Sequence, residues 1–512
     1  MIGSRLRRHR IATIGLTMFM GLGLMAAALP VGASPRKSAT MPQPERWRAM
    51  AVADLKAARQ AIEATHPGMI DAQNPRFRDW VARGYDEALA LAPRVNSYDS
   101  ALSLVRYYTS GFYDGHLGYS DDVRNNAEPI LSNGWTVFGL NGHFEVVATA
   151  PQWPTPLPPI GARLVDCDGR SPRALIEEDA APYLDRRDLP ELKAMLAMSL
   201  VQPRMPDLMF GVCRFDAPES GLLELPISYH PLPAPDFFAL MKPPAAPARP
   251  ENRFELKDGT LWIHAANFNL GHDEAAALDT MLRRLRELQG VERIVFDSRG
   301  NGGGSSAVGD RIFEAATGGL EIDLTDAEQL PRTHAQWRVS DIALATAAQH
   351  VKTSAETYGE TSEQATRARD FQARLKAARA AGQEWLEQPV GPLVTRTEAA
   401  RRHAHLRRFS GPVALVTDAR CASACLDFAD TVRQVPGAVH VGRTTSSDTV
   451  YIDIGFATLP SGNRLFMPLK VWRNRTRGNN EALVPDVPFD GDIGDDEAVK
   501  RATLAALGAA SG

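Results

Sequence analysis

The feature that most constrains the fold is an alternation of short apolar strands and amphipathic helices that begins near Phe254. The expected strands are Thr260–Ala265, Ile294–Phe296, Pro412–Thr417 and Ala438–Val441. Helical patterns lie between them, at Glu274–Leu288, Ser305–Ala316 and Ala424–Val435. Strands that are apolar on both faces are typical of sheets covered by helices. The sequence therefore predicts an α/β core with a mixed sheet over residues 254–508.

Two further regions precede this core. Helical spacing of apolar residues at 47–65, 75–91 and 98–112 predicts a helical N-terminal domain over 47–125. A β-rich module is expected at 133–231, with strands at 135–140, 144–148, 162–165, 208–214 and 222–229, a hairpin turn at Asn141-Gly142 and a helical interlude at 172–200. The Pro- and Ala-rich stretch 232–253 is interpreted as a linker.

The charged, helix-prone stretch 327–408 interrupts the core pattern. We interpret it as an insertion, which forms either a lid or a solvated helical appendage.

The first residues predict export. Arg5, Arg7, Arg8 and Arg10 precede an apolar run that ends at Val31-Gly32-Ala33, which is typical of a secretory signal over residues 1–33. A flexible leader is expected at 34–46. The alternative is an uncleaved membrane anchor, because about 20 apolar residues can span a bilayer. We expect a periplasmic or secreted protein that touches the membrane only if the signal is retained.

Composition excludes some classes of partner. With 57 Lys and Arg against 61 Asp and Glu, the net charge is −4, which argues against a nucleic-acid-binding protein. An oxidising compartment permits disulfides, and we expect the pairs Cys167 with Cys213 and Cys421 with Cys425, each within one region. Cys421 and Cys425 lack histidines at zinc-site spacing. No metal and no cofactor are expected.

Ser423 is the first candidate for chemistry. It stands between an apolar strand and a helix, in the run Cys421-Ala422-Ser423-Ala424-Cys425. Unpaired N–H groups at such a helix start could stabilise an oxyanion, with Ala424 as one donor. The alternative is that Ser423 merely caps the helix.

A glycine-rich run, Arg299-Gly300-Asn301-Gly302-Gly303-Gly304, follows another strand. Glycines let backbone N–H groups approach a ligand closely. Gly302 or Gly303 could supply a second oxyanion donor. Phosphate binding is a weaker alternative, because the Lys-Ser/Thr ending of a P-loop is missing, and an ordinary flexible turn is the simplest one.

Two residues could assist a serine nucleophile. His116, in Asp114-Gly115-His116, could act as the base, since histidine titrates near working pH. Glu481 could hold the imidazole in the required tautomer. The alternatives are a structural histidine and a surface carboxylate.

Taken in order, the motifs DSRGNGGG, the Ser423-Ala424 turn after GPVALVTD, VGRTT and LVPDV resemble the tail-specific (C-terminal-processing) serine peptidase family. The β-rich module, with IGARLVDCDGRSP, resembles the PDZ-like domain of that family. The helical start ending in DGHL is similar to the tricorn-core branch.

The resemblance implies a peptidase core of the ClpP/crotonase-like type that hydrolyses peptides or proteins. Its implied roles are Ser423 as nucleophile, His116 as general base, Glu481 as the acidic residue that orients it, and Ala424 with Gly302 or Gly303 as the oxyanion hole. The PDZ-like module would bind an extended peptide or a C-terminal carboxylate by strand addition. The alternative is that it only shapes the cleft, because the usual carboxylate-binding loop is not evident in the sequence.

One departure concerns the base. The bacterial processing branch uses a Lys about 25 residues after its Ser, but residues 444–449 hold none, and Lys470 would have to fold back. A Ser–His–Glu site is therefore favoured over a Ser–Lys dyad, with Cys421 as an alternative nucleophile. Two other functions remain open: a non-catalytic peptide- or ligand-binding protein, and an esterase or amidase for small molecules.

Overall fold

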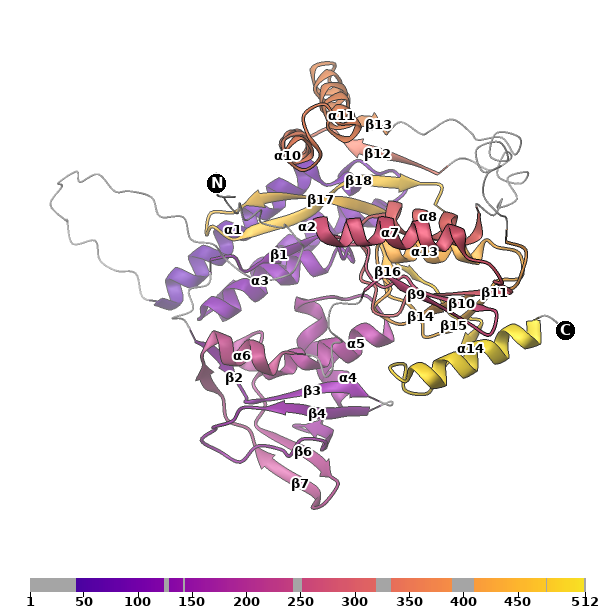
Figure 1. Ribbon diagram of the computed structural model, residues 1–512. Helices are drawn as coiled ribbons and strands as arrows, with labels where there is room; N and C mark the ends of the chain where they lie inside the picture. The colour runs from indigo at the N-terminus through magenta and orange to yellow at the C-terminus, as the bar shows by residue number, and fades with distance from the viewer. Residues whose placement is uncertain are drawn as a thin grey trace, which may run out of the picture.

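The computed structural model describes residues 43–123, 129–140, 143–242, 251–318, 333–388, 409–475 and 477–510 (Figure 1). The expected signal at 1–33 lies outside this part. The first helix, α1 (Gln43–Thr65), begins inside the stretch 34–46 that was expected to be a flexible leader, so that prediction is wrong for its last four residues. No helix in the described ranges is long and apolar enough to cross a membrane.

The N-terminal region is helical, as expected. Helix α1 packs with α2 (Pro75–Ala90) and α3 (Tyr98–Ser110) around a shared core that includes Leu55, Ile62, Trp80, Leu102 and Tyr108. Ser97 starts α3 with a capping box shared with Ser100, which satisfies N–H groups that the helix leaves unpaired. The turn that contains His116 follows the end of α3.

The β-rich module is an antiparallel sheet in the order β3-β4-β5-β6-β7. Its strands are β3 (Trp135–Leu140), β4 (His143–Thr149), β5 (Arg163–Cys167), β6 (Val212–Ala217) and β7 (Gly221–Pro226). The strand expected at 208–214 begins only at Val212, because Pro206–Leu208 forms a 3₁₀ turn. The expected turn Asn141-Gly142 lies outside the described residues.

The interlude of this module is helical, as α4 (Pro172–Leu175), α5 (Pro190–Leu196) and short helical turns between and after them. The flanking strands β2 (Ile130–Ser132) and β8 (His230–Leu232) pair with each other. The expected linker 232–253 is partly wrong, because Ala234–Leu240 forms helix α6. Phe237 and Leu240 of α6 are buried in one cluster with Ile130 and Leu232.

The C-terminal half is built on a six-stranded sheet in the order β20-β15-β14-β11-β10-β9. The strands are β9 (Arg253–Lys257), β10 (Thr260–His264), β11 (Arg293–Asp297), β14 (Val413–Thr417), β15 (Val439–Gly442) and β20 (Val487–Pro488), and only β9 runs antiparallel to its neighbour. The α/β prediction is confirmed.

Helices cover both faces of this sheet. Helices α7 (His272–Glu287), α8 (Ser306–Thr317) and α13 (Ala424–Arg433) lie on one face, and α14 (Asp496–Ala510) lies on the other (Figure 1). Phe296 and Leu415 point to the first face, whereas Val295 and Val416 point to the second. This two-sided burial explains why the strands are continuously apolar.

A second sheet joins regions that are far apart in the chain. It runs β1 (Gly118–Ser120), β18 (Arg464–Arg473), β12 (His334–Arg338) and β13 (Trp385–Glu387), and β17 (Tyr451–Thr458) also pairs with β18. Gly118 lies opposite Phe466 in the antiparallel pair β1–β18. Because His116 comes two residues before β1, this pairing attaches its turn to the C-terminal half.

The stretch 327–408 contributes directly to that sheet. Beyond β12 and β13 it forms α10 (Asp341–Tyr358) and α11 (Glu363–Ala380), which pack on each other. Trp337 and Leu386 are buried in one cluster with Leu469 of β18. The appendage interpretation is therefore wrong for the described residues of this stretch, because two of its strands belong to a sheet shared with the core. A lid role stays a prediction.

Candidate active site

Ser423 occupies a strained turn between β14 and α13. Its backbone angles are φ 54° and ψ −124°, which L-residues rarely adopt and which cost roughly 1–3 kcal/mol. Its hydroxyl makes no capping hydrogen bond to the helix, nor any other bond within the described chain. Ser423 thus occupies the N-cap position, but its side chain does not cap the helix. Its half-buried hydroxyl is free to react.

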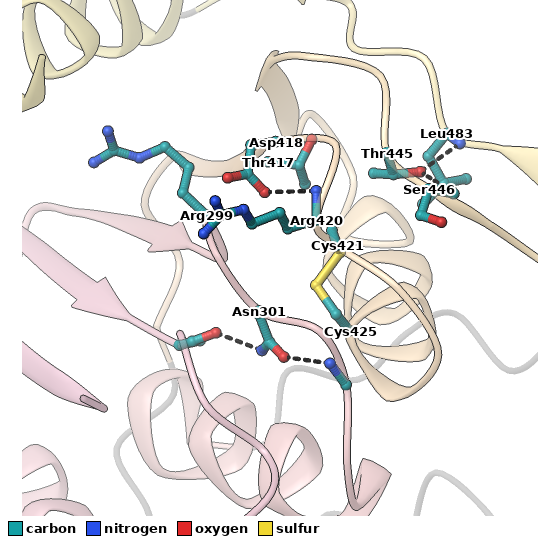
Figure 2. Close-up of a disulfide and its surroundings, with 12 residues drawn as sticks. Arg299, Asn301, Thr417, Asp418, Arg420, Cys421, Cys425, Thr445, Ser446 and Leu483 are labelled. Carbon is teal, nitrogen blue, oxygen red and sulfur yellow. Dashed lines mark hydrogen bonds between the residues drawn. A yellow bond between two sulfur atoms is a disulfide. The ribbon is translucent and has the colours of Figure 1, made fainter. Parts of the chain in front are cut away.

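Two side chains, the buried Asn301 and the half-buried Asp418, hold the loops around this turn (Figure 2). The Asn301 side chain accepts a hydrogen bond from the Gly303 N–H at 2.9 Å and donates one to the Ala265 carbonyl at 2.7 Å. The backbone carbonyl of Asn301 accepts the Ala422 N–H at 3.3 Å. Asp418 accepts from the N–H groups of Gly300 and Arg420, both at 3.0 Å. The glycine-rich loop and the nucleophile turn are therefore tied into one unit.

Gly303 touches the nucleophile turn directly. A Cβ placed on Gly303 would lie 2.7 Å from the Ala422 carbonyl oxygen and 2.8 Å from the Ser423 Cβ, and its φ is +98°. Both the close approach and the positive φ require glycine at this position.

The candidate oxyanion donors can now be separated. Ala424 is the first residue of α13, and its N–H has no acceptor among the described residues. Gly302 is exposed, and its N–H has no acceptor there either. The Gly303 N–H, by contrast, already donates to Asn301. Ala424 and Gly302 are consequently the donors available to a ligand.

His116 lies in the turn between α3 and β1. Its backbone N–H donates to the Asp114 carboxylate at 2.8 Å. Its Nδ1 lies 3.3 Å from Oδ1 of Asp448, in β16 (Ser447–Asp448), but the angles are poor for a hydrogen bond. The His116 side chain is 20% exposed and that of Asp448 is 7% exposed. Burial raises the pKa of the Asp448 carboxyl, and His116 and Arg475 offset part of this rise.

The expected carboxylate, Glu481, makes a different contact. Glu481 is exposed, and its side chain accepts the Gly478 N–H at 2.6 Å. It faces Asp448 in the backbone pairing of β16 with β19 (Glu481–Ala482), but no contact between Glu481 and His116 occurs in the described chain. Asp448 is the carboxylate beside the imidazole. The sequence signal for it is the acid in the stretch 444–449, the same stretch that lacks the lysine of the bacterial processing branch.

Segment 445–448 connects the two halves of the site. The Ser446 N–H donates to the Cys421 carbonyl at 3.1 Å, two residues before Ser423. Two residues later, Asp448 meets His116. Arg187 reinforces this link, because its guanidinium donates to the Ser447 carbonyl at 3.0 Å and lies against Gly115.

A buried hydrogen-bond network of His66, Asp114 and Thr449 holds the His116 turn in place. The His66 Nδ1 accepts the Gly68 N–H at 3.0 Å, so its Nε2 carries the proton and donates to Asp114 at 3.1 Å. Burial lowers the pKa of His66, although Asp114 opposes this. Asp114 also accepts a bond from the Thr449 hydroxyl at 3.2 Å. Asp114 therefore orients both the His116 turn and the chain just after Asp448, a role that the sequence did not reveal.

Two alternatives are corrected by the structure. Lys470 does not fold back to Ser423: its ammonium pairs with Asp453 at 2.8 Å and lies over the rings of Trp337 and Trp472. Cys421 is no thiol nucleophile, because it forms a disulfide with Cys425. The second expected disulfide, Cys167–Cys213, is also present.

A free hydroxyl in a strained strand-to-helix turn, open backbone donors and an imidazole beside a carboxylate define the class of serine hydrolases. Residues 259–489, which include the six-stranded sheet from β10 onward, match the model of peptidase family S41, and this match points to a serine peptidase. The family implies peptide or protein substrates.

Solved structures agree on the fold. The structure of mature CPAF complexed with lactacystin has a TM-score of 0.53 and 12% identity, and the match covers 91% of this chain and 100% of that one. A second structure of mature CPAF gives a TM-score of 0.52 and 11% identity over 91% of this chain and 98% of that one. Comparison with curated protein sequences finds no match.

Proposed function

We propose that this serine peptidase is exported and that Ser423, His116 and Asp448 form its catalytic triad, with the N–H groups of Ala424 and Gly302 as the oxyanion hole. The observation that carries the assignment is the free Ser423 hydroxyl in a strained turn packed against the glycine-rich loop. Two disulfides and the basic, apolar N-terminal segment support export to an oxidising compartment.

The chemistry starts at Ser423, whose hydroxyl attacks the carbonyl carbon of a bound peptide. A serine hydroxyl needs an adjacent base, and His116 takes its proton. Because the Nδ1 of His116 faces Asp448, its Nε2 is the nitrogen left to receive that proton. Asp448 holds the imidazole in this tautomer and stabilises the imidazolium. The long contact of 3.3 Å is expected to shorten when substrate binds, as catalytic hydrogen bonds often do.

The tetrahedral intermediate needs donors for its oxyanion. The N–H groups of Ala424 and Gly302 lack acceptors among the described residues, so they lose no hydrogen bond when they bind it. Each such donor is worth on the order of 10²–10³-fold in rate. His116 then protonates the leaving amine, and water hydrolyses the acyl-enzyme by the same steps in reverse.

The carboxylate is the point at which this proposal differs from the residues that the family resemblance suggested. Glu481 is exposed and engaged with Gly478, whereas Asp448 is buried within reach of the imidazole. We therefore assign the orienting role to Asp448. Recognition of an extended peptide by the β-rich module, through strand addition, remains part of the proposal.

The test is hydrolysis of a fluorogenic peptide library and a panel of short-chain esters by the protein without residues 1–33. Ser423→Ala is expected to abolish peptide hydrolysis. Ser305→Ala is the matched control, because Ser305 also precedes a helix without capping it, and it is expected to leave turnover unchanged. Peptide binding without turnover by the wild-type chain would favour a binding protein, and turnover of esters alone would favour an esterase.

A further inference from the structure

The Cys421–Cys425 disulfide encircles the proposed nucleophile. The two half-cystines are four residues apart, so the ring they close contains Ala422, Ser423 and Ala424 (Figure 2). Both are fully buried in the hydrophobic cluster under α13, whereas Ser423 is only half-buried. The disulfide is thus on the inner side of the turn, and the reactive hydroxyl is on the outer side.

The reactive groups at the centre of this turn make no hydrogen bond within the described chain, although the Ser423 carbonyl accepts the Leu426 N–H at 2.8 Å. The Ala424 N–H has no acceptor among the described residues, and neither has the Ser423 hydroxyl. Both must stay free if they are to bind the oxyanion and attack the substrate. Apart from its carbonyl, the strained Ser423 backbone is therefore held through its neighbours, because a residue in a sparsely populated region of φ and ψ persists only when its surroundings determine it.

Besides Ala422, whose N–H donates to the Asn301 carbonyl, the neighbours that hold it are the two half-cystines and the residues bonded to them. The Cys421 N–H donates to the Asp418 carbonyl, and the Cys421 carbonyl accepts the Ser446 N–H, both at 3.1 Å. On the helix side, the Cys425 N–H donates to the Ala422 carbonyl at 3.1 Å. The disulfide joins these two anchored positions covalently, which fixes the path of the three residues between them.

We propose that the Cys421–Cys425 disulfide is a positioning element of the active site, and that turnover depends on its being oxidised. The inference rests on the proposed role of Ser423. Reduction by a dithiol would transfer two electrons and two protons to the disulfide, giving two thiols and the oxidised reagent. The turn would then lose its covalent closure, and the fraction of molecules with Ser423 and the Ala424 N–H in the reactive geometry would fall.

The Cys167–Cys213 disulfide supplies a matched control. It joins directly paired residues of β5 and β6 in the β-rich module, 46 residues apart in sequence. None of its contacts involves Ser423, His116 or Asp448. Because constraint of the unfolded chain grows with loop length, this disulfide is expected to contribute more to stability than Cys421–Cys425, which closes a far shorter loop. Loss of Cys167–Cys213 should therefore lower stability more, whereas loss of Cys421–Cys425 should lower turnover more.

The experiment compares Cys421→Ala/Cys425→Ala with Cys167→Ala/Cys213→Ala in kcat, KM and the rate of labelling by a fluorophosphonate. We expect the first double variant to lose about tenfold or more in kcat and in labelling rate, with KM changed less than about threefold. The second should keep its kcat at 25 °C and show the larger fall in Tm. Unchanged kcat and labelling in the first variant, or an equal loss in both, would overturn the proposal.

A second measurement avoids dependence on the folding of the first variant. In the Cys167→Ala/Cys213→Ala protein, the remaining disulfide is titrated with dithiothreitol and its thiols are counted. Turnover should fall as two thiols appear and return on reoxidation; full turnover with both thiols free would contradict the proposal. Failure of the proposed function has a different signature, namely peptide hydrolysis that survives Ser423→Ala.

Discussion

The two halves of the proposed site are held in place by different forces. Around Ser423 the support is mostly backbone geometry, from loops that follow the neighbouring parallel strands β11 and β14 and are joined by Asn301 and Asp418. Around His116 the support is a set of buried charged and polar side chains, including Asp114, His66 and Asp448. The nucleophile half therefore lies at the carboxyl ends of two neighbouring strands, whereas the base half is assembled from segments that are distant in the sequence.

This difference predicts how each half fails. Changes of shape should damage the nucleophile half, because its geometry is set by close backbone approach. Changes of charge or hydrogen bonding should damage the base half, because buried polar groups are costly when they lose a partner.

The largest effect is expected from removing the base. His116→Ala should lower kcat by on the order of 10³–10⁴-fold, because nothing then takes the Ser423 proton. KM should change little, and the protein should remain folded, since the His116 ring makes no hydrogen bond through Nδ1. Peptide kinetics and a thermal melt check both points. Turnover within tenfold of wild type would remove His116 from the mechanism.

A shape change in the nucleophile half should come next. Gly303→Ala would place a methyl group 2.8 Å from the Ser423 Cβ at a positive φ, and should cost about 10²-fold or more in kcat. Gly302→Ala is the matched control, because its Cβ would meet no atom within 4 Å and the backbone N–H is kept. Equal losses in the two variants would show that contact with Ser423 is not what Gly303 provides.

A change of charge in the base half separates the two candidate carboxylates. Asp448→Asn should reduce kcat by about 10–10²-fold, because the amide no longer stabilises the imidazolium. Glu481→Gln should stay within about twofold of wild type, as expected for an exposed side chain. The comparison is made at saturating peptide. The reverse order would return the orienting role to Glu481.

The smallest expected effect is on stability rather than on rate. His440 of β15 is buried beside Thr417, and burial lowers its pKa to about 4. Its neutral form is therefore favoured by folding, so the stabilisation is complete above pH 6.5 and is lost as the pH falls through about 4. The loss is at most about 3 kcal/mol.

Urea denaturation at pH 7 and pH 4.5 tests this titration. His440→Gln should be less stable than wild type at pH 7 but should lose less stability on acidification. An identical pH dependence in the variant would assign the acid sensitivity to other groups, with the buried His66 as the first candidate, since burial lowers its pKa as well.

The same contrast explains what the sequence could predict. The strands of the core, the helices that cover them, Ser423, the glycine-rich loop and both disulfide pairs lie in local patterns, and the structure has them where they were expected. The contact of Asp448 with His116 depends on the pairing of β1 with β18 and on Arg187. These are long-range contacts, which the pattern of neighbouring residues in the sequence does not indicate. Glu481, the carboxylate that was expected, lies opposite Asp448 on the neighbouring strand of the β16–β19 pair.

Two other errors have the same origin. Ala234–Leu240 was expected to be linker because of its composition, but Phe237 and Leu240 find an apolar surface to pack on. The stretch 327–408 was interpreted as an insertion, either a lid or a helical appendage, because it is charged and helix-prone, yet its strand β12 pairs with β18 and β13 pairs with β12. In both cases tertiary contacts decided a structure that local propensity left open.

The most direct test of the central idea, that turns more than 300 residues apart in the sequence act as one site, is the second-order rate of fluorophosphonate labelling, with the labelled peptide identified by mass spectrometry. Wild-type protein should carry the label on Ser423, and His116→Ala should react at that same serine about 10²-fold or more slowly. Labelling of another residue, or an equal rate in the variant, would contradict it.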